Sequence, residues 1–237
     1  MIVAIHQPNY FPWLGYFRKM IEADVFIFLD DVQFSKGSYT NRVGIRSGSG
    51  RRWLTVTVNV NFGQLISEVS VAKVDWIDRH LEILRNTYKE CPYFGRVWPD
   101  IEAAYVTLKS AKLSEINIHL IQHAAHCLNI ETDMRLASTL NVSGKSDDRL
   151  IALLGQVSPG CVYLSGEGGG NYQSDDKFRM HGFDIRYVSF QHPEYSQYPS
   201  AEPFQAGLSI LDAAFNLGWE QTADLLKIPE RNNRRAD

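Results

Sequence analysis

IVAIHQPNYFPWLGYFRKMIEADVFIFLDDVQF, residues 2–34, is the stretch that decides the fold of this chain. It opens on a short apolar run at residues 2–5 and closes on a second apolar run at residues 25–29. Runs this short and this apolar fit strands that are buried on both faces of a parallel sheet. Between them, residues 14–21 repeat apolar side chains at helical spacing. A strand, a helix and a second strand in this order predict a βαβ unit.

Polar side chains follow each of the two expected strands. In an open parallel sheet, ligands bind beyond the carboxyl ends of the strands. We therefore expect the two polar clusters to converge on one crevice. A histidine there can move a proton or stabilise charge, and paired carboxylates can orient a hydroxyl, an amine or a metal ion. The candidates are His6, Gln7, Asn9, Tyr10, Asp30, Asp31 and Gln33.

The remaining chain extends the βαβ unit into a single α/β domain over residues 1–237. Strands are expected near residues 2, 25, 133, 161 and 184, with helices between them. This pattern predicts a Rossmann-like parallel sheet of about five strands, with helices on both faces and default strand order 3-2-1-4-5. Residues 35–73 alternate apolar and polar side chains and predict a small antiparallel β insertion, whose hairpin should overhang the crevice. Residues 75–129 have helical periodicity and predict a helical segment packed on the sheet.

Further candidates lie just after expected strands or at expected helix starts. Arg42 is a natural partner for a phosphate or a carboxylate. Three consecutive glycines permit close backbone approach to a ligand. Gly-Lys-Ser at 144–146 lacks the upstream glycine of a P-loop, since position 139 is Thr139, so we reject that motif. The candidates are Asn41, Arg42, Lys145, Arg149, Gly166, Gly168, Gly169, Asn171, Tyr172 and His192.

Each of these motifs also has a plainer explanation. His6 can be a structural histidine at a strand end, Asp30-Asp31 can be a turn, and the glycines can form a flexible loop. Glu115, His119, His123 and His126 share one helical stripe, but HExxH is absent, so a solvated polar flank is expected and no metal site.

Composition narrows the class of protein. The chain has 237 residues and a formal net charge of −3, whereas nucleic-acid binders are usually basic, so no nucleic-acid partner is expected. Three widely spaced cysteines form no C-x-x-C pair, which fits a reducing compartment. No run approaches a membrane span, and residues 1–5 lack the basic start of a signal peptide, so we expect a cytoplasmic protein. Cofactor and oligomeric state are not determined by the sequence.

Taken together, these motifs resemble the WbqC-like family of bacterial proteins, often encoded with genes for surface polysaccharides such as O-antigen. The matching segments are IHQPNYFPWLGYFRKM, DVFIFLDDVQFSKGSYTNR, GKSDDRLIAL, VYLSGEGGGNY and FQAGLSILDAAFNLG, in the order of the family. Ala213-Ala214 replaces the usual aliphatic pair after LSILD. The resemblance implies work on sugar nucleotides or on their acyl modification.

The first thirty residues are also similar to the start of pantothenate synthetase and related nucleotidyl-transferring folds. Those proteins place two histidines over the phosphates of ATP, whereas here only His6 is present. Whether ATP is used stays open.

These observations favour a transferase or ligase that modifies an amino sugar or sugar nucleotide. His6 would be the general base or charge stabiliser, and Asp30 and Asp31 would orient a hydroxyl, an amine or a metal. Arg42, Lys145 and the glycine segment would hold phosphates. The alternative is a non-catalytic module that binds a nucleotide or sugar and assists a glycan-biosynthesis enzyme.

Overall fold

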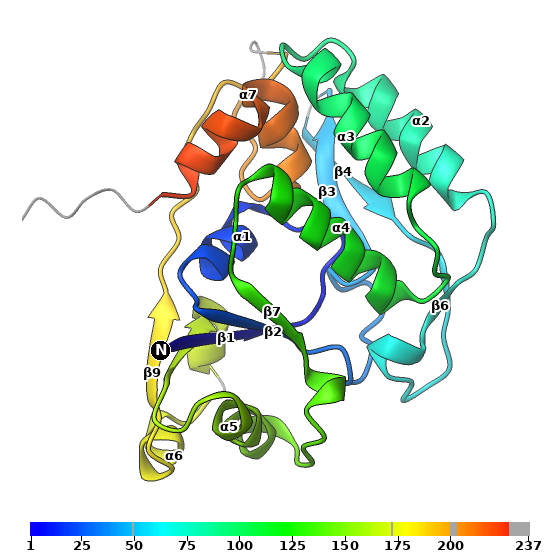
Figure 1. Ribbon diagram of the computed structural model, residues 1–237. Helices are drawn as coiled ribbons and strands as arrows, with labels where there is room; N and C mark the ends of the chain where they lie inside the picture. Colours follow the sequence, from blue (N-terminus) through cyan, green and yellow to red (C-terminus); the bar gives the residue numbers. More distant parts are fainter. Residues whose placement is uncertain (49, 172, 200–202, 228–237) are drawn as a thin grey trace, which may run out of the picture.

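A computed structural model describes residues 1–48, 50–171, 173–199 and 203–227 (Figure 1). A five-stranded parallel sheet forms its centre, with the order β7-β2-β1-β8-β9. The predicted Rossmann-like sheet and its order 3-2-1-4-5 are therefore confirmed. The strands are β1 (Ile2–His6), β2 (Val25–Phe28), β7 (Asp133–Leu136), β8 (Val162–Gly166) and β9 (Asp184–Val188).

Helices cover both faces of this sheet, as Figure 1 shows. Side chains alternate along β1, so Val3 and Ile5 face one side and Ala4 faces the other. The Val3 side packs against α5 (Ser146–Val157) and α6 (Asp175–Met180). The Ala4 side belongs to a larger core with α1 (Leu14–Ile21), α4 (Leu113–Cys127) and α7 (Ile210–Leu225).

The β insertion and the helical segment join the same larger core. The strands β3 (Arg42–Ser47) and β4 (Gly50–Thr55) form an antiparallel hairpin, and β5 (Val58–Asn59) pairs with β6 (Ser70–Val71). The helices α2 (Trp76–Tyr88) and α3 (Phe94–Val106) complete this half. A hydrogen bond joins the hairpin to α2, since the Arg46 backbone N–H donates to Tyr88 Oη at 3.2 Å.

One glycine divides α7 into two helical stretches. Gly218 has φ 79°, and there a first helical stretch ends and a second begins. A Cβ at this position would lie 2.7 Å from Tyr93 Cδ1, so close packing as well as the left-handed backbone requires glycine.

Among the described residues, no helix is long and apolar enough to span a membrane.

Candidate functional site

A cavity of about 390 Å³ opens at the carboxyl ends of β1 and β8. The neighbours of β1 in the sheet are β2 on one side and β8 on the other, so the chain order reverses between β1 and β8. Ligands of open α/β sheets bind at this switch point. We call this space the polar cavity because of its hydrogen-bonding side chains, which are His6, Gln7, Lys19, Ser146, Asp147, Arg149, Tyr163, Ser165 and Gln173.

A second cavity of about 280 Å³ adjoins the first. The two share His6 and Lys19 on one wall, and Gly166 and Gly168 on another. We call the second space the aromatic cavity, because its other lining residues are Trp13, Gly15, Tyr16, Glu167, Val188 and Phe190. The site thus has two compartments of different chemistry that meet at a histidine and a lysine.

Lys19 is the most unusual group at this junction. It lies on α1 and is only 3% exposed, and its Nζ donates to the carbonyl of Ile5 at 2.7 Å. Within the described residues it forms no ion pair. Burial lowers the pKa of Lys19 to about 7, because the charged ammonium loses its hydration there. Lys19 can therefore gain and lose a proton near neutral pH.

His6 faces Lys19 in a fixed orientation. Its Nδ1 lies 3.1 Å from the carbonyl oxygen of Gln7, which can only accept, so Nδ1 carries the proton and Nε2 is an acceptor. Tyr16 Oη donates to the same carbonyl at 3.1 Å, and its ring packs edge-on against the imidazole. Burial, and then the charge of Lys19, lower the pKa of His6 to about 3. His6 is therefore uncharged at physiological pH.

The glycine segment after β8 forms the opposite wall. Ser165 Oγ donates to Gln173 Oε1 at 2.7 Å, and a Cβ on Gly169 would lie 2.3 Å from that Oγ. Gly169 is therefore required by packing. At Gly166 and Gly168 an added Cβ would meet nothing within 4 Å, so both face open space. Side chains at these two positions would project from the cavity wall, where the backbone itself is now accessible.

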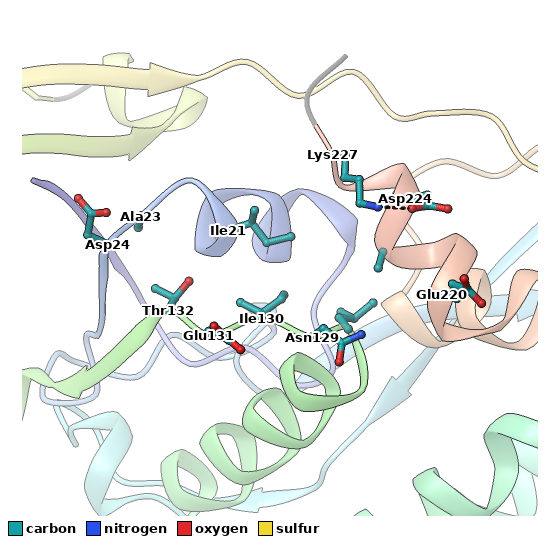
Figure 2. A pocket seen from close by; sticks show the side chains of 12 residues that line it. Ile21, Ala23, Asp24, Asn129, Ile130, Glu131, Thr132, Glu220, Asp224 and Lys227 are labelled. Carbon is teal, nitrogen blue, oxygen red and sulfur yellow. Dashed lines mark hydrogen bonds and ion pairs between the residues drawn. The ribbon is translucent and has the colours of Figure 1, made fainter. Parts of the chain in front are cut away.

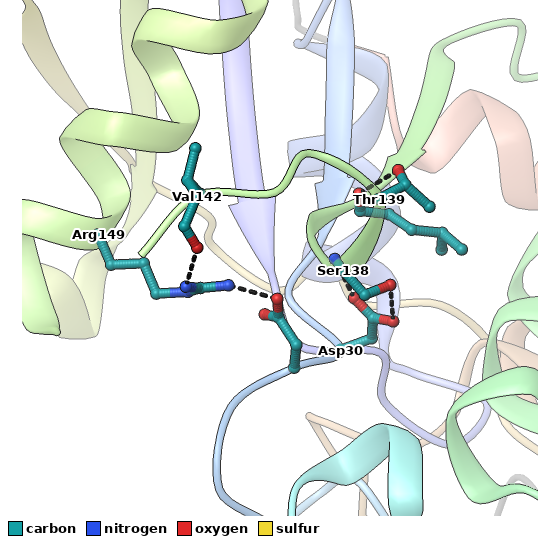
Figure 3. Close-up of polar contacts among 7 residues, drawn as sticks. Asp30, Ser138, Thr139, Val142 and Arg149 are labelled. Carbon is teal, nitrogen blue, oxygen red and sulfur yellow. Dashed lines mark hydrogen bonds and ion pairs between the residues drawn. The ribbon is translucent and has the colours of Figure 1, made fainter. Parts of the chain in front are cut away.

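The start of α5 supplies charged groups to the polar cavity. Arg149 donates through Nη1 to the carbonyl of Val142 at 2.6 Å and through Nη2 to Asp31 (Figure 3). Asp31 itself does not line the cavity and instead fixes the guanidinium that does. Asp147 accepts from the Ser174 backbone N–H at 3.1 Å, while its buried Oδ1 has no hydrogen-bond partner among the described residues. One buried carboxylate oxygen is thus left without a protein donor.

Asp30 differs from its expected role. Its Oδ1 accepts from the Ser138 backbone N–H at 3.0 Å, and its Oδ2 accepts from Ser138 Oγ at 2.7 Å (Figure 3). Both oxygens are used, and Asp30 lines neither cavity. The carboxylate therefore links the end of β2 to the turn that follows β7, and we no longer assign it to catalysis.

Replacing Asp30 with alanine is expected to lower stability. The change removes both hydrogen bonds to Ser138, and we expect the free energy of unfolding to fall by roughly 1–3 kcal/mol. Urea denaturation measures this. Ser138→Ala is the matched comparison, because it removes only the hydroxyl bond and should cause a smaller loss. An unchanged stability in Asp30→Ala would return Asp30 to the list of functional candidates.

Several other predicted residues are engaged away from both cavities. Tyr10 Oη donates to His80 Nδ1 at 2.7 Å and also contacts Tyr105 Oη, deep in the helical core. The Asn41 amide donates to the carbonyl of Val56 at 3.1 Å. The guanidinium of Arg42 lies 4.2 Å from the ring centroid of Trp53. None of these side chains reaches the crevice predicted for it.

The rest of the predicted set divides in the same way. Asn9 is buried outside both cavities, Gln33 and Lys145 are exposed, and His192 packs against Trp13 with 4.9 Å between ring centroids. The side chain of Asn171, and all of Tyr172, lie outside the described residues. No residue of the hairpin lines either cavity, so the hairpin is not a wall of them. The predicted residues that do line the polar cavity are His6, Gln7, Arg149, Gly166, Gly168 and Gly169.

Sequence reasoning missed Lys19, Ser146, Asp147, Tyr163, Ser165 and Gln173 as cavity residues. For Lys19 a signal existed, because it lies three and four residues after Tyr16 and Gly15, on the buried face of the helix. A lysine on an otherwise apolar helical face is a sign of a buried charge. The other five flank motifs that were noticed, but nothing in the sequence shows which of their side chains turn inward.

One histidine of the stripe on α4 makes local hydrogen bonds. His119 Nε2 lies 3.0 Å from the carbonyl of Ala104, to which it donates. Within the described residues, no group of three or more His, Cys, Asp or Glu side chains is placed to hold a metal ion.

A larger cavity of about 610 Å³ lies at the amino ends of the parallel strands (Figure 2). Its walls come from the segments that precede β2 and β7, such as Asp24 and Thr132, and from the end of α7. Ligands of parallel sheets bind at the carboxyl edge, so volume alone does not make this the site. Lys227, one of its lining residues, is paired with Asp224 across 2.5 Å.

Comparison with known proteins covers most of the chain. The model of the WbqC-like protein family matches residues 7–224. An uncharacterized protein of Mycobacterium tuberculosis, Rv1507c, is 31% identical over 221 residues, which is 92% of this chain and 94% of that protein. The match includes every lining residue of both cavities except Ile5 and His6, which lie just before it.

Proposed function

The chain belongs to the WbqC-like protein family, and on that premise we propose that it is a transferase or amide-forming ligase acting on an amino sugar or sugar nucleotide. The family suggests a role in polysaccharide biosynthesis. The observation that carries the chemical part of the proposal is the buried Lys19 at the junction of the two cavities.

A buried ammonium without an ion pair destabilises a protein, so its position calls for a functional reason. Lys19 lies where two ligands would meet. A proton acceptor works best when its pKa is close to the operating pH, and burial lowers the pKa of Lys19 to about 7. In its neutral form Lys19 takes the proton of the attacking amino or hydroxyl group. In its charged form it stabilises negative charge on the group being transferred.

The role of His6 changes accordingly. With its pKa lowered to about 3, His6 is a weak base, and Lys19 is the better proton acceptor. The neutral imidazole instead presents Nε2 as a fixed acceptor for a substrate N–H or O–H. Its work is then to orient the attacking group next to Lys19.

The polar cavity suits a phosphate-bearing ligand. The first turn of α5 carries backbone N–H groups without helical partners, and Ser146, Asp147 and Arg149 of that turn line the cavity. Gly166 and Gly168 offer accessible backbone opposite. A volume of about 390 Å³ falls within the usual range for small-ligand sites.

The first test is a thermal-shift screen with UDP, dTDP and GDP, their sugar derivatives, and free amino sugars. We expect a sugar nucleotide to stabilise the protein more than its nucleotide alone. At about 100 times its Kd, a ligand that binds only the folded state adds about 2.7 kcal/mol. Failure of every nucleotide and sugar nucleotide to stabilise the protein would contradict the proposal.

His6→Ala separates an enzyme from a binding module. For an enzyme, we expect the variant to lose about 10²-fold or more in turnover of the ligand found in the screen, because the attacking group is no longer oriented, with Kd changed by less than about threefold. His126→Ala, an exposed histidine on α4, is the control and should keep full turnover. Ligand binding without any turnover by the wild-type protein would instead favour the non-catalytic module.

A further inference from the structure

We propose that the aromatic cavity is a separate subsite for an amine-bearing sugar, the acceptor, while the polar cavity takes the phosphate-bearing partner. This inference rests on the proposed function and names the substrate class of its second compartment. The two cavities share four lining residues and differ in the others, since the aromatic cavity adds Trp13, Tyr16 and Phe190 whereas the polar cavity adds Ser146, Arg149 and Gln173.

The lining of the aromatic cavity suits a cationic ring while the Lys19 side chain, which also lines it, is uncharged. Trp13, Tyr16 and Phe190 border it, and Glu167 contributes a carboxylate. Aromatic rings attract an ammonium group through their negative faces, and a nearby carboxylate adds to this attraction. The volume of about 280 Å³ is at the small end for ligand sites, which fits one monosaccharide better than an oligosaccharide.

The junction allows two bound ligands to touch. Lys19 and His6 form one shared wall, and Gly166 and Gly168 form the other. Neither glycine has a side chain that could separate the compartments, and an added Cβ on either would meet nothing within 4 Å. An amino group bound in the aromatic cavity would therefore lie beside Lys19 and face the ligand in the polar cavity.

The Trp13 indole, which forms one wall of the aromatic cavity, is held in place by its neighbours. Its centroid lies 5.4 Å from the Phe190 ring and 4.9 Å from the His192 ring. On another side it lies over Gly15, where an added Cβ would be 2.2 Å from Trp13 Cη2 and Cζ3. A preorganised aromatic wall of this kind binds without first being ordered. It also means that one methyl group on residue 15 must displace the indole.

Gly15→Ala is therefore the test variant. Gly15 lies in α1, and alanine is a better helix former than glycine, so the backbone tolerates the change. Gly95→Ala is the matched control, because Gly95 lies in α3 and an added Cβ there meets nothing within 4 Å. The probes are UDP and pyrophosphate for the polar cavity, and methyl 2-amino-2-deoxyglucopyranoside for the aromatic cavity, each measured by calorimetry.

We expect Gly15→Ala to weaken amino-sugar binding at least tenfold while the Kd of UDP or pyrophosphate changes less than twofold. Gly95→Ala should change neither. Glu167→Gln should weaken the amino sugar but not its N-acetyl counterpart, which carries no charge. Amino-sugar binding should also alter tryptophan fluorescence, and Trp13→Phe should remove that change.

Three results would overturn the inference. They are an amino sugar that does not bind, an equal loss for both classes of probe in Gly15→Ala, and a fluorescence change that survives in Trp13→Phe. Failure of the proposed function is distinguishable, since UDP and pyrophosphate would then not bind while the amino sugar still could.

Discussion

Lys19→Met is expected to make the protein more stable at neutral pH while abolishing turnover of the ligand found in the thermal-shift screen. Lys19 is buried at the junction of the two cavities and has no ion pair within the described residues. Methionine has a similar shape and needs no hydration, so it removes the penalty for burying the charge. The lost hydrogen bond to the Ile5 carbonyl costs only about 1 kcal/mol.

The gain in stability should depend on pH in a defined direction. The pKa of Lys19 is 10.5 in the unfolded chain and about 7 in the folded protein. Between these values the unfolded state binds a proton that the folded state lacks, so wild-type stability falls as the pH drops from about 10.5 to about 7. The advantage of Lys19→Met should thus be absent above pH 10.5 and complete below pH 7, on the order of 4 kcal/mol.

Calorimetric melting of both proteins at pH 7 and at pH 10 measures this difference. Lys73→Met is the control, because Lys73 is exposed and its removal should shift Tm little at either pH. Turnover should be retained in the control. A Lys19→Met protein that is less stable than the wild type at pH 7 would mean that the ammonium has a structural role, and our assignment of Lys19 would then be wrong.

Arg46→Met should have a large effect in the opposite direction, although this residue lies in neither cavity. Arg46 Nη1 donates to Gln197 Oε1 at 3.2 Å and to the carbonyl of Pro203 at 3.0 Å. Gln197 Nε2 and Tyr195 Oη each donate to Asp212 Oδ2 at 2.8 Å. Arg46 is 3% exposed and Asp212 is fully buried, so a glutamine connects two opposite buried charges. The network ties β3, the segment after β9 and α7 together.

Removing the guanidinium leaves the Asp212 carboxylate buried without its compensating charge. Burial raises the pKa of Asp212, and Arg46 opposes that rise, so its loss makes ionised Asp212 still less favourable. We expect the free energy of unfolding to fall by about 3–5 kcal/mol. At roughly 2–4 °C per kcal/mol for a chain of this size, Tm should drop by on the order of 10 °C.

A double-mutant cycle with Asp212→Asn tests whether the two charges are coupled. We expect Arg46→Met/Asp212→Asn to be less destabilised than the sum of the single variants, by about 0.5–3 kcal/mol. Arg52→Met, an exposed arginine on the same hairpin, should cost little. Strict additivity, or a small loss in Arg46→Met, would show that the network stabilises the fold less than its burial indicates.

The fold was largely predictable because its signals are local. Residues 2–5 and 25–29 are continuous apolar runs, as expected for strands that are covered on both faces of a parallel sheet. In the structure they form most of β1 and β2. Gly218 interrupts α7, since the left-handed backbone there favours glycine. Within the predicted β insertion, the strand division between β4 and β5 was not predictable, because alternation does not reveal where a strand changes partner.

By itself, the sequence determined the family resemblance, the parallel sheet and its crevice, because strand ends place His6 and the glycine segment at one edge whatever surrounds them. Only the tertiary structure decided which polar side chains enter that crevice. Asp30 follows a strand end, yet it bonds to Ser138, while Lys19 comes from the middle of a helix and is buried at the junction. The physical reason is that secondary-structure patterns fix the backbone path, whereas the orientation and ionisation of a side chain depend on partners distant in sequence.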